Sequence, residues 1–160
     1  MKKLHDNISP LDSRYAGKIE STRSIFSEAN LIKIRFELEI DWLIFLCSKL
    51  PSNFPTLSNA SLNKILKFKK DFNSKSVIAI KKIELKTNHD VKAVEYYIRD
   101  YFLKDKTLSK YVHLIHFGLT SEDLNSLSYA VIVKDGIADH LKNLKSLQNV
   151  LSKKSGQWSS

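Results

Sequence analysis

The amino-acid sequence predicts an all-α protein. Only four glycines and three prolines occur among 160 residues, which is below the usual share of these two helix-interrupting residues. Between them run long segments in which apolar residues recur at steps of three and four, the spacing of one face of a helix. Together these observations favour a chain of helices joined by short breaks.

The first half of the sequence predicts an irregular start followed by three helices. Residues 1–18 show no helical period and carry the turn-like segment Ser9-Pro10-Leu11-Asp12-Ser13-Arg14-Tyr15. A helical pattern covers residues 19–50, and Pro51 and Pro55 end it. Its predicted inward face comprises Leu31, Ile34, Leu38, Trp42, Phe45 and Leu46. Two further helices are expected, one capped by Ser61 and one beginning near Ser76.

A polar cluster, Asn88-His89-Asp90, opens the next predicted helix, which runs to about Phe102. The Asn88 side chain is expected to cap it, and Asp90 places a negative charge in the first turn, where the helix dipole favours one. His89 then lies beside free backbone N–H groups, and its ring exchanges a proton near neutral pH. The cluster suggests proton transfer on an anionic substrate. The alternative is a satisfied structural His-Asp pair.

The last third predicts a short helix and then a long one. The short helix covers about Ser109 to Phe117 and ends at Gly118, and Thr120 with Asp123 resembles a capping box for the long helix. That helix is expected to reach about Leu151. Its apolar seam is spaced as in a coiled coil and comprises Leu124, Leu127, Val131, Ala138, Leu141 and Leu144. So small a chain cannot cover this seam by itself, so long partner helices are expected.

Charge and composition limit the classes of function. The net charge of +9 suits nucleic acid, an acidic membrane surface or an anionic small molecule, but the lysines are spread along the chain, which favours a solvated surface. No apolar run is long enough to cross a bilayer, and no secretory signal is evident at the start. A single cysteine, Cys47, agrees with a reducing cytosol. No set of residues has the spacing of metal ligands, so no metal is expected.

Three polar clusters interrupt the apolar pattern: Arg14-Tyr15, Asn88-His89-Asp90 and Thr120-Ser121. An arginine suits a phosphate or carboxylate, and a helix start bearing Thr and Ser suits a carboxylate. Each cluster also has a structural explanation, as a surface pair, a polar pair or a helix cap. His116 stands near the third cluster and either lines the same pocket or makes a structural hydrogen bond.

Three segments of the sequence together resemble the bacterial adenylosuccinate lyase family of the fumarase/aspartase superfamily. They are residues 9–15, then Thr87-Asn88-His89-Asp90-Val91-Lys92-Ala93-Val94-Glu95-Tyr96, then His116-Phe117-Gly118-Leu119-Thr120-Ser121-Glu122-Asp123-Leu124-Asn125. Their order and separation resemble the amino-terminal third of that family. The resemblance implies an amino-terminal helical domain over residues 1–111 and, over 112–160, the first long helix of a central helical-bundle domain.

The resemblance also implies a reaction and a site. The reaction is β-elimination of fumarate from adenylosuccinate to give AMP, and from SAICAR to give AICAR, without a cofactor, in a cytoplasmic homotetramer. Arg14 and Tyr15 would bind the nucleotide, Asn88, His89 and Asp90 would contact the substrate, and Thr120 and Ser121 would hold a succinyl carboxylate. His89 would bind the phosphate or assist proton transfer.

Two motifs of the family do not occur in this sequence: Thr-His-Gly-Gln with its second histidine, and the serine-bearing loop. The sequence is therefore expected to be a fragment without lyase activity alone, whether cut from a longer chain, encoded by a broken gene or half of a split enzyme. Three alternatives stay open. They are a noncatalytic nucleotide-binding or helix-pairing module, another lyase of the superfamily, and a basic nucleic-acid binder, which the scattered lysines disfavour.

Overall fold

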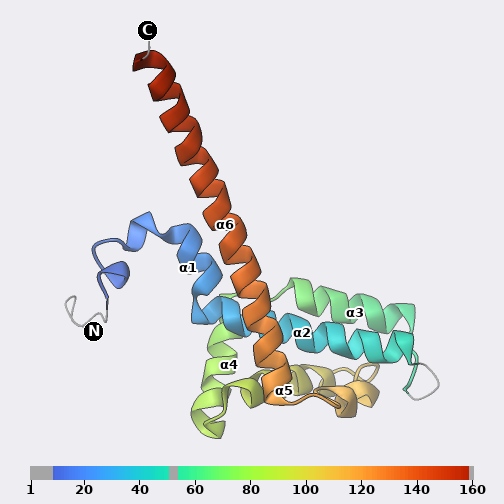
Figure 1. The fold of residues 1–160 in the computed structure, drawn as a ribbon. Helices are drawn as coiled ribbons and strands as arrows, with labels where there is room; N and C mark the ends of the chain where they lie inside the picture. The colour runs from blue at the N-terminus through green and yellow to red at the C-terminus, as the bar shows by residue number, and fades with distance from the viewer. Residues whose placement is uncertain (1–8, 51–53, 159–160) are drawn as a thin grey trace. The chain divides into compact units, whose positions relative to one another are not determined.

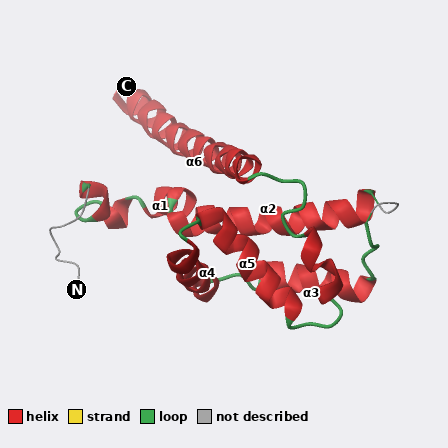
Figure 2. Cartoon of the chain, turned by 90° about the horizontal axis from the view of Figure 1, so that it is seen from below, coloured by secondary structure: helices red, strands yellow, loops and turns green. Residues whose placement is uncertain are grey.

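The computed structural model describes residues 9–50 and 54–158, and every regular element among them is helical (Figures 1 and 2). The all-α prediction is therefore confirmed. The 3₁₀ helices are η1 (Pro10–Asp12), η2 (Ala16–Lys18) and η3 (Ser109–Leu114). The α-helices are α1 (Glu20–Phe26), α2 (Glu28–Lys49), α3 (Asn59–Lys70), α4 (Ser74–Thr87), α5 (Asp90–Leu103) and α6 (Ser121–Trp158). The chain divides into two compact units, one from residues 28–130 and one from residues 1–27 with 131–160.

Helices α2, α3, α4 and α5 enclose the hydrophobic core of the 28–130 unit. Phe36 of α2 is fully buried and contacts Phe68 of α3 edge to face, with ring centroids 5.0 Å apart. Phe68 in turn stacks on Tyr101 of α5. Other buried core residues are Ile40, Leu43, Ile65, Ile80, Val94, Ile98, Phe102, Leu108 and Tyr111. Burial of so much apolar surface is the main source of this unit's stability.

The helix predicted over residues 19–50 is in fact two helices, α1 and α2, separated at Ser27. The backbone of Ser27 is extended (ψ 152°), and its N–H closes the end of α1 by donating to the Arg23 carbonyl. Serine is favoured just before a helix, and Glu28 then places a negative charge in the first turn of α2. These local preferences override the continuous apolar period.

The prediction of which face of α2 enters the core was also partly wrong. The core side is the stripe Ile32, Phe36, Ile40, Leu43 and Cys47. Phe45, which was predicted to point inward, is 45% exposed. With Leu38 and Trp42 it lines a shallow apolar groove that also includes Leu119, Leu124 and Leu127. Because α2 is apolar on two sides, its sequence period alone does not select the core side.

Two other helix starts differ from the sequence prediction. Ser58, not Ser61, caps α3: its hydroxyl accepts the Ser61 N–H at 3.1 Å, and Ser61 is buried inside the first turn. Helix α4 starts at Ser74 behind Asn73, which forms a reciprocal capping box with Ser76. The short helix near residue 110 is a 3₁₀ helix that ends at Leu114, three residues earlier than predicted.

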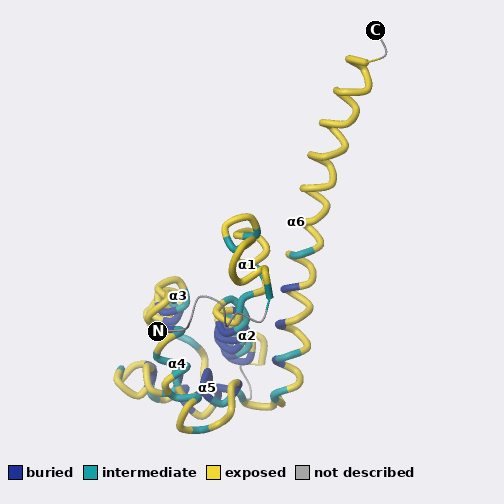
Figure 3. Tube along the Cα trace, turned by 90° about the vertical axis from the view of Figure 1, so that its left-hand side faces the viewer, coloured by how far each residue is buried: buried dark blue, intermediate teal, exposed yellow. Residues whose placement is uncertain are grey.

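Helix α6 is longer than predicted, because it continues past Leu151 to Trp158. At about 1.5 Å per residue, its 38 residues span about 57 Å. Most of its length is exposed in Figure 3, including the apolar residues Leu141, Leu144, Leu147 and Leu151, each at least 47% accessible. Thus the described part of the chain leaves the predicted seam largely uncovered.

Candidate functional site

The corner between α4 and α5 is formed by Asn88, His89 and Asp90, and we refer to these residues as the α4–α5 corner. Asn88 does not cap α5 as predicted. It adopts a left-handed backbone conformation (φ 50°, ψ 36°) and closes α4, its N–H donating to the Glu84 carbonyl at 2.8 Å. Asparagine tolerates this conformation better than most residues. The turn leaves only His89 between the residue that closes one helix and the first residue of the next.

His89 is the actual N-cap of α5. Its Nδ1 accepts a hydrogen bond from the Lys92 N–H at 3.2 Å, and its side chain is half exposed. A ring nitrogen that accepts a hydrogen bond carries no proton, so the neutral ring has its proton on Nε2. The fold therefore fixes one nitrogen of His89 on the helix and leaves Nε2–H as the donor available for a ligand.

Arg35 of α2 connects the α4–α5 corner to the start of α6. One guanidinium nitrogen, Nη1, lies 2.8 Å from Asp90 Oδ2, and Nη2 donates to Asn125 Oδ1 at 2.7 Å. Partial burial alone would raise the pKa of Asp90. The Val91 N–H and the Arg35 charge outweigh this effect and hold that pKa below its usual value. Asp90 is thus a stable anion bound to a buried cation.

An open cavity of about 440 Å³ adjoins the corner. Its lining residues come from α2, the end of α4, the corner and the first part of α6: Glu28, Leu31, Ile32, Arg35, Glu84, Asn88, His89, Asp90 and Tyr129. Lys81 binds both Glu28 and Glu84, at 2.7 and 2.9 Å, and so neutralises part of the acidic wall. The cavity is large enough for a small molecule with polar groups.

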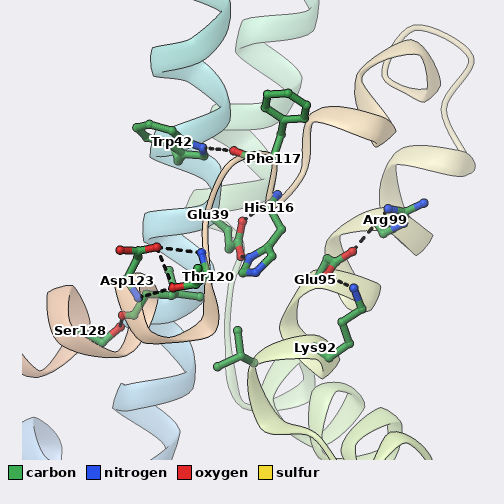
Figure 4. Close-up of polar contacts among 12 residues, drawn as sticks. Glu39, Trp42, Lys92, Glu95, Arg99, His116, Phe117, Thr120, Asp123 and Ser128 are labelled. Atoms are coloured by element: carbon green, nitrogen blue, oxygen red, sulfur yellow. Dashed lines mark hydrogen bonds and ion pairs between the residues drawn. The ribbon is translucent and has the colours of Figure 1, made fainter.

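Thr120, Ser121 and Asp123 start α6, and we refer to them as the α6 cap. Asp123 Oδ2 accepts from the Thr120 N–H at 2.8 Å and from its hydroxyl at 2.7 Å (Figure 4). The Thr120 hydroxyl accepts the Asp123 N–H at 3.2 Å. The predicted capping box is confirmed. Both bonds from Thr120 keep the pKa of Asp123 below its usual value.

The turn before the α6 cap is held by α2. Glu39 is almost fully buried, and its Oε1 lies 2.5 Å from His116 Nδ1 while its Oε2 accepts the His116 N–H at 3.1 Å. Hydrogen bonding to Glu39 raises the pKa of His116, although burial opposes this. Trp42, one turn further along α2, donates from Nε1 to the Phe117 carbonyl at 2.8 Å (Figure 4). Of the two alternatives for His116, the structural hydrogen bond is the one observed.

Arg14 and Tyr15 belong to the other compact unit. The Arg14 guanidinium carbon lies 5.5 Å from the centre of the Tyr15 ring, within cation–π range. Their participation in the cavity stays a prediction. In the 28–130 unit, the residues that sequence reasoning missed are Arg35, Glu39 and Asn125. The sequence did contain one sign of buried charge: Arg35 and Glu39 stand four residues apart within the apolar pattern of α2.

The described residues contain neither a cluster of metal ligands nor a membrane-spanning helix. Over residues 9–50 and 54–158, no three His, Cys, Asp or Glu side chains gather closely enough to hold a metal ion. In the same residues, no helix is both long and apolar enough to cross a bilayer.

Comparison with known proteins shows which family the chain resembles. A family model described as "Lyase" matches residues 13–160. Three similar proteins are all named adenylosuccinate lyase. The one from Haemophilus influenzae is 43% identical over 131 residues, 79% of this chain. Those from Legionella pneumophila (strain Corby) and Buchnera aphidicola subsp. Schizaphis graminum are 41% and 36% identical over 82% and 94% of it. The chain spans 28% to 34% of the length of these relatives.

Proposed function

Because this chain belongs to the lyase family, we propose that it provides substrate-binding residues of an adenylosuccinate lyase. The reaction would be β-elimination of fumarate from adenylosuccinate to give AMP, and from SAICAR to give AICAR. The observation that carries the proposal is the meeting of Asn88, His89 and Asp90 at the wall of one cavity, in a chain 36% to 43% identical to relatives of that name. No cofactor is part of the proposal.

The chemistry asks for groups of three kinds. A base removes a proton from the carbon beside a succinyl carboxylate, the electron pair forms the double bond of fumarate, and the C–N bond breaks. Donors must stabilise the charge that develops, and an acid must protonate the departing nitrogen. In this chain we assign His89 the role of donor: with Nδ1 occupied by the Lys92 N–H, its Nε2–H would donate a hydrogen bond to a phosphate oxygen. To assist proton transfer instead, the ring would start as the imidazolium, with the Lys92 N–H released from Nδ1, and would return to the neutral ring after giving its Nε2 proton to the departing nitrogen.

The start of α6 would hold a succinyl carboxylate. The first N–H groups of a helix have no partner within it, and the helix dipole favours an anion there. Asp123 already occupies the N–H and hydroxyl of Thr120. A carboxylate would therefore bind the N–H groups of Ser121 and Glu122, or displace Asp123 from Thr120. Arg14 and Tyr15 would complete the nucleotide side.

The assembly is part of the same proposal. Residues 1–111 would form the amino-terminal helical domain, and 112–160 would begin the central bundle of a homotetramer. The exposed apolar residues of α6 support this, because such a seam calls for partner helices. The cytoplasm is the proposed location, since the buried free thiol of Cys47 suits a reducing compartment.

Calorimetric titration of the purified chain with AMP tests the binding role, and fumarate absorbance after addition of adenylosuccinate tests turnover. We expect AMP to bind and no fumarate to form, because the second histidine and the serine loop of the family do not occur in this sequence. The control for replacement of a histidine is His140→Ala. His140 lies on α6 and does not line the cavity, so this variant should bind AMP as the unchanged chain does. Fumarate release above background would contradict the expected inactivity, and failure to bind AMP would contradict the binding role.

A second candidate function is helix pairing without catalysis, and the exposed seam of α6 favours it. Sedimentation of the chain and of the variant carrying Leu141→Glu and Leu144→Glu tests this. A self-associating chain that the double substitution makes monomeric, with no AMP binding in either protein, would support pairing alone.

A further inference from the structure

Two charged side chains of α2, Arg35 and Glu39, are buried. Arg35 lines the cavity, but neither residue was assigned a substrate contact above. They are 4% and 1% exposed and stand four residues apart, one above the other on the same face of the helix. A buried charge is strongly disfavoured unless it is paired and hydrogen-bonded. Both are paired, and each pair reaches a segment bearing proposed substrate contacts. These partners point to a role beyond packing.

Arg35 holds two helix starts at once. Its Nη1 binds Asp90, the first residue of α5. Its Nη2 donates to Asn125, which follows the α6 cap by two residues. A guanidinium is planar and its nitrogens have fixed directions, so two acceptors bound to one guanidinium have little freedom relative to each other. Arg35 thus sets the position of α5 relative to the start of α6.

Glu39 fixes the turn that leads into the α6 cap. Both of its carboxylate oxygens bind His116, one through the backbone N–H and one through the ring. The backbone of His116 is left-handed (φ 63°), a conformation that is uncommon for a residue with a β-carbon, and the two bonds to Glu39 hold it there. Thr120 follows four residues later. Losing Glu39 would release this turn and, with it, the start of α6.

We propose that Arg35 and Glu39 are positioning residues that keep the α4–α5 corner and the α6 cap in the relation that one substrate requires. The proposal rests on the proposed function only for the nature of that substrate. Neither side chain is assigned contact with reacting atoms. Each acts through the residues that it binds: Arg35 acts through Asp90 and Asn125, and Glu39 acts through His116.

The test is amide NMR of the 160-residue chain. Arg35→Lys keeps the charge but not the planar fork, and should shift the amide signals of both the α4–α5 corner and the α6 cap. Glu39→Gln should shift those of Thr120 and Ser121. The matched controls are Arg99→Lys on α5, whose partner is Glu95, and Glu37→Gln on α2, whose partner is Lys33. They alter ion pairs outside both segments and should leave both segments unchanged.

A pH titration separates positioning from mere stabilisation. In the unchanged chain the amide signals of Thr120 and Ser121 should follow the titration of His116, and in Glu39→Gln that coupling should vanish and the pKa of His116 should fall. The other charges that act on His116 are Glu95, Lys92 and Asp123, and they are the same in both proteins. A purely structural role would lower the melting temperature without uncoupling these signals.

AMP affinity gives the second readout, taken well below the melting temperature of every variant. In metal sites, removing the outer partner of a ligand typically costs about 10- to 100-fold in affinity. By analogy, a loss of about tenfold in AMP affinity is expected for Arg35→Lys and Glu39→Gln. If Arg35→Lys does not fold, Asn125→Ala decides: it frees one arm of the guanidinium without leaving a charge unpaired, and should still shift the signals of the α4–α5 corner.

Shifts confined to the residues that directly touch each replaced side chain would overturn the proposal, as would titration of Thr120 and Ser121 that persists in Glu39→Gln. If the unchanged chain binds no AMP, the proposed function fails. The amide and pH measurements still decide the positioning role, because neither needs a ligand.

Discussion

Replacement of Glu39 by glutamine is expected to destabilise the chain by about 2 kcal/mol in mild acid and by much less in mild base. The carboxylate of Glu39 is fully buried and makes two hydrogen bonds to His116, whose side chain is 17% exposed. Hydrogen bonds to charged groups contribute about 1.5–3 kcal/mol each. Glutamine can still accept one bond through its carbonyl, so one charged bond is the appropriate loss.

The sign of the pH effect follows from His116. Pairing with Glu39 raises the pKa of His116 in the folded chain above the ordinary value of about 6.5. A group whose folded pKa is raised stabilises the fold fully below the unfolded pKa, and this contribution is lost as the pH rises through the folded pKa. Above that point the ring is neutral, and glutamine replaces glutamate at little cost.

Urea unfolding of both proteins, followed by circular dichroism at about pH 5.5 and about pH 9, measures the difference. The control is Glu37→Gln, whose ion pair with Lys33 lies on the surface of α2, at 3.7 Å. Such pairs contribute about 0.3–0.5 kcal/mol, and no dependence on His116 is expected. An equal loss of stability for Glu39→Gln at both pH values would refute the reasoning.

Three further predictions concern the core and the caps. Phe36→Ala should lower the free energy of unfolding by about 3–5 kcal/mol in urea titration, because it opens a cavity beside Phe68 in the fully buried core; a loss below about 1 kcal/mol would contradict that packing. Thr120→Ala removes one half of the capping box with Asp123 and should cost about 1 kcal/mol in the same assay, with Thr120→Ser as the control that keeps it. His89→Asn should keep the cap of α5 and so the melting temperature, yet weaken AMP binding in calorimetry; equal affinity would mean that the ring is only a cap.

Some of this architecture was predictable because it depends on neighbours in the sequence. The capping box of Thr120 and Asp123 spans three residues, and the start of α5 follows from a polar cluster before an apolar stripe. Even here the local chemistry was ambiguous. Asn88 and His89 are adjacent and both side chains are able to accept a hydrogen bond. Only the left-handed backbone of Asn88 shows which of them closes α4 and which caps α5.

The rest depends on contacts between distant residues. Arg35 and Asn125 are separated by 90 positions and Glu39 and His116 by 77. The two charges four residues apart in α2 could mark a buried position, but no local pattern identifies their partners. Read alone, Arg35 and Glu39 look like surface charges of an amphipathic helix. The helix period also left two apolar sides of α2 to choose between, and the choice depends on where α3 and α5 pack.

The bond from Trp42 to the Phe117 carbonyl has a practical consequence for spectroscopy. The chain contains two tryptophans. Trp158 is 81% exposed, so its fluorescence is that of an indole ring in water. Replacing Trp158 with phenylalanine would leave Trp42 as the single tryptophan, bound through its indole N–H to the turn that enters α6. Stopped-flow fluorescence of that variant could then follow the movement of this turn in real time as a ligand arrives, without any added dye.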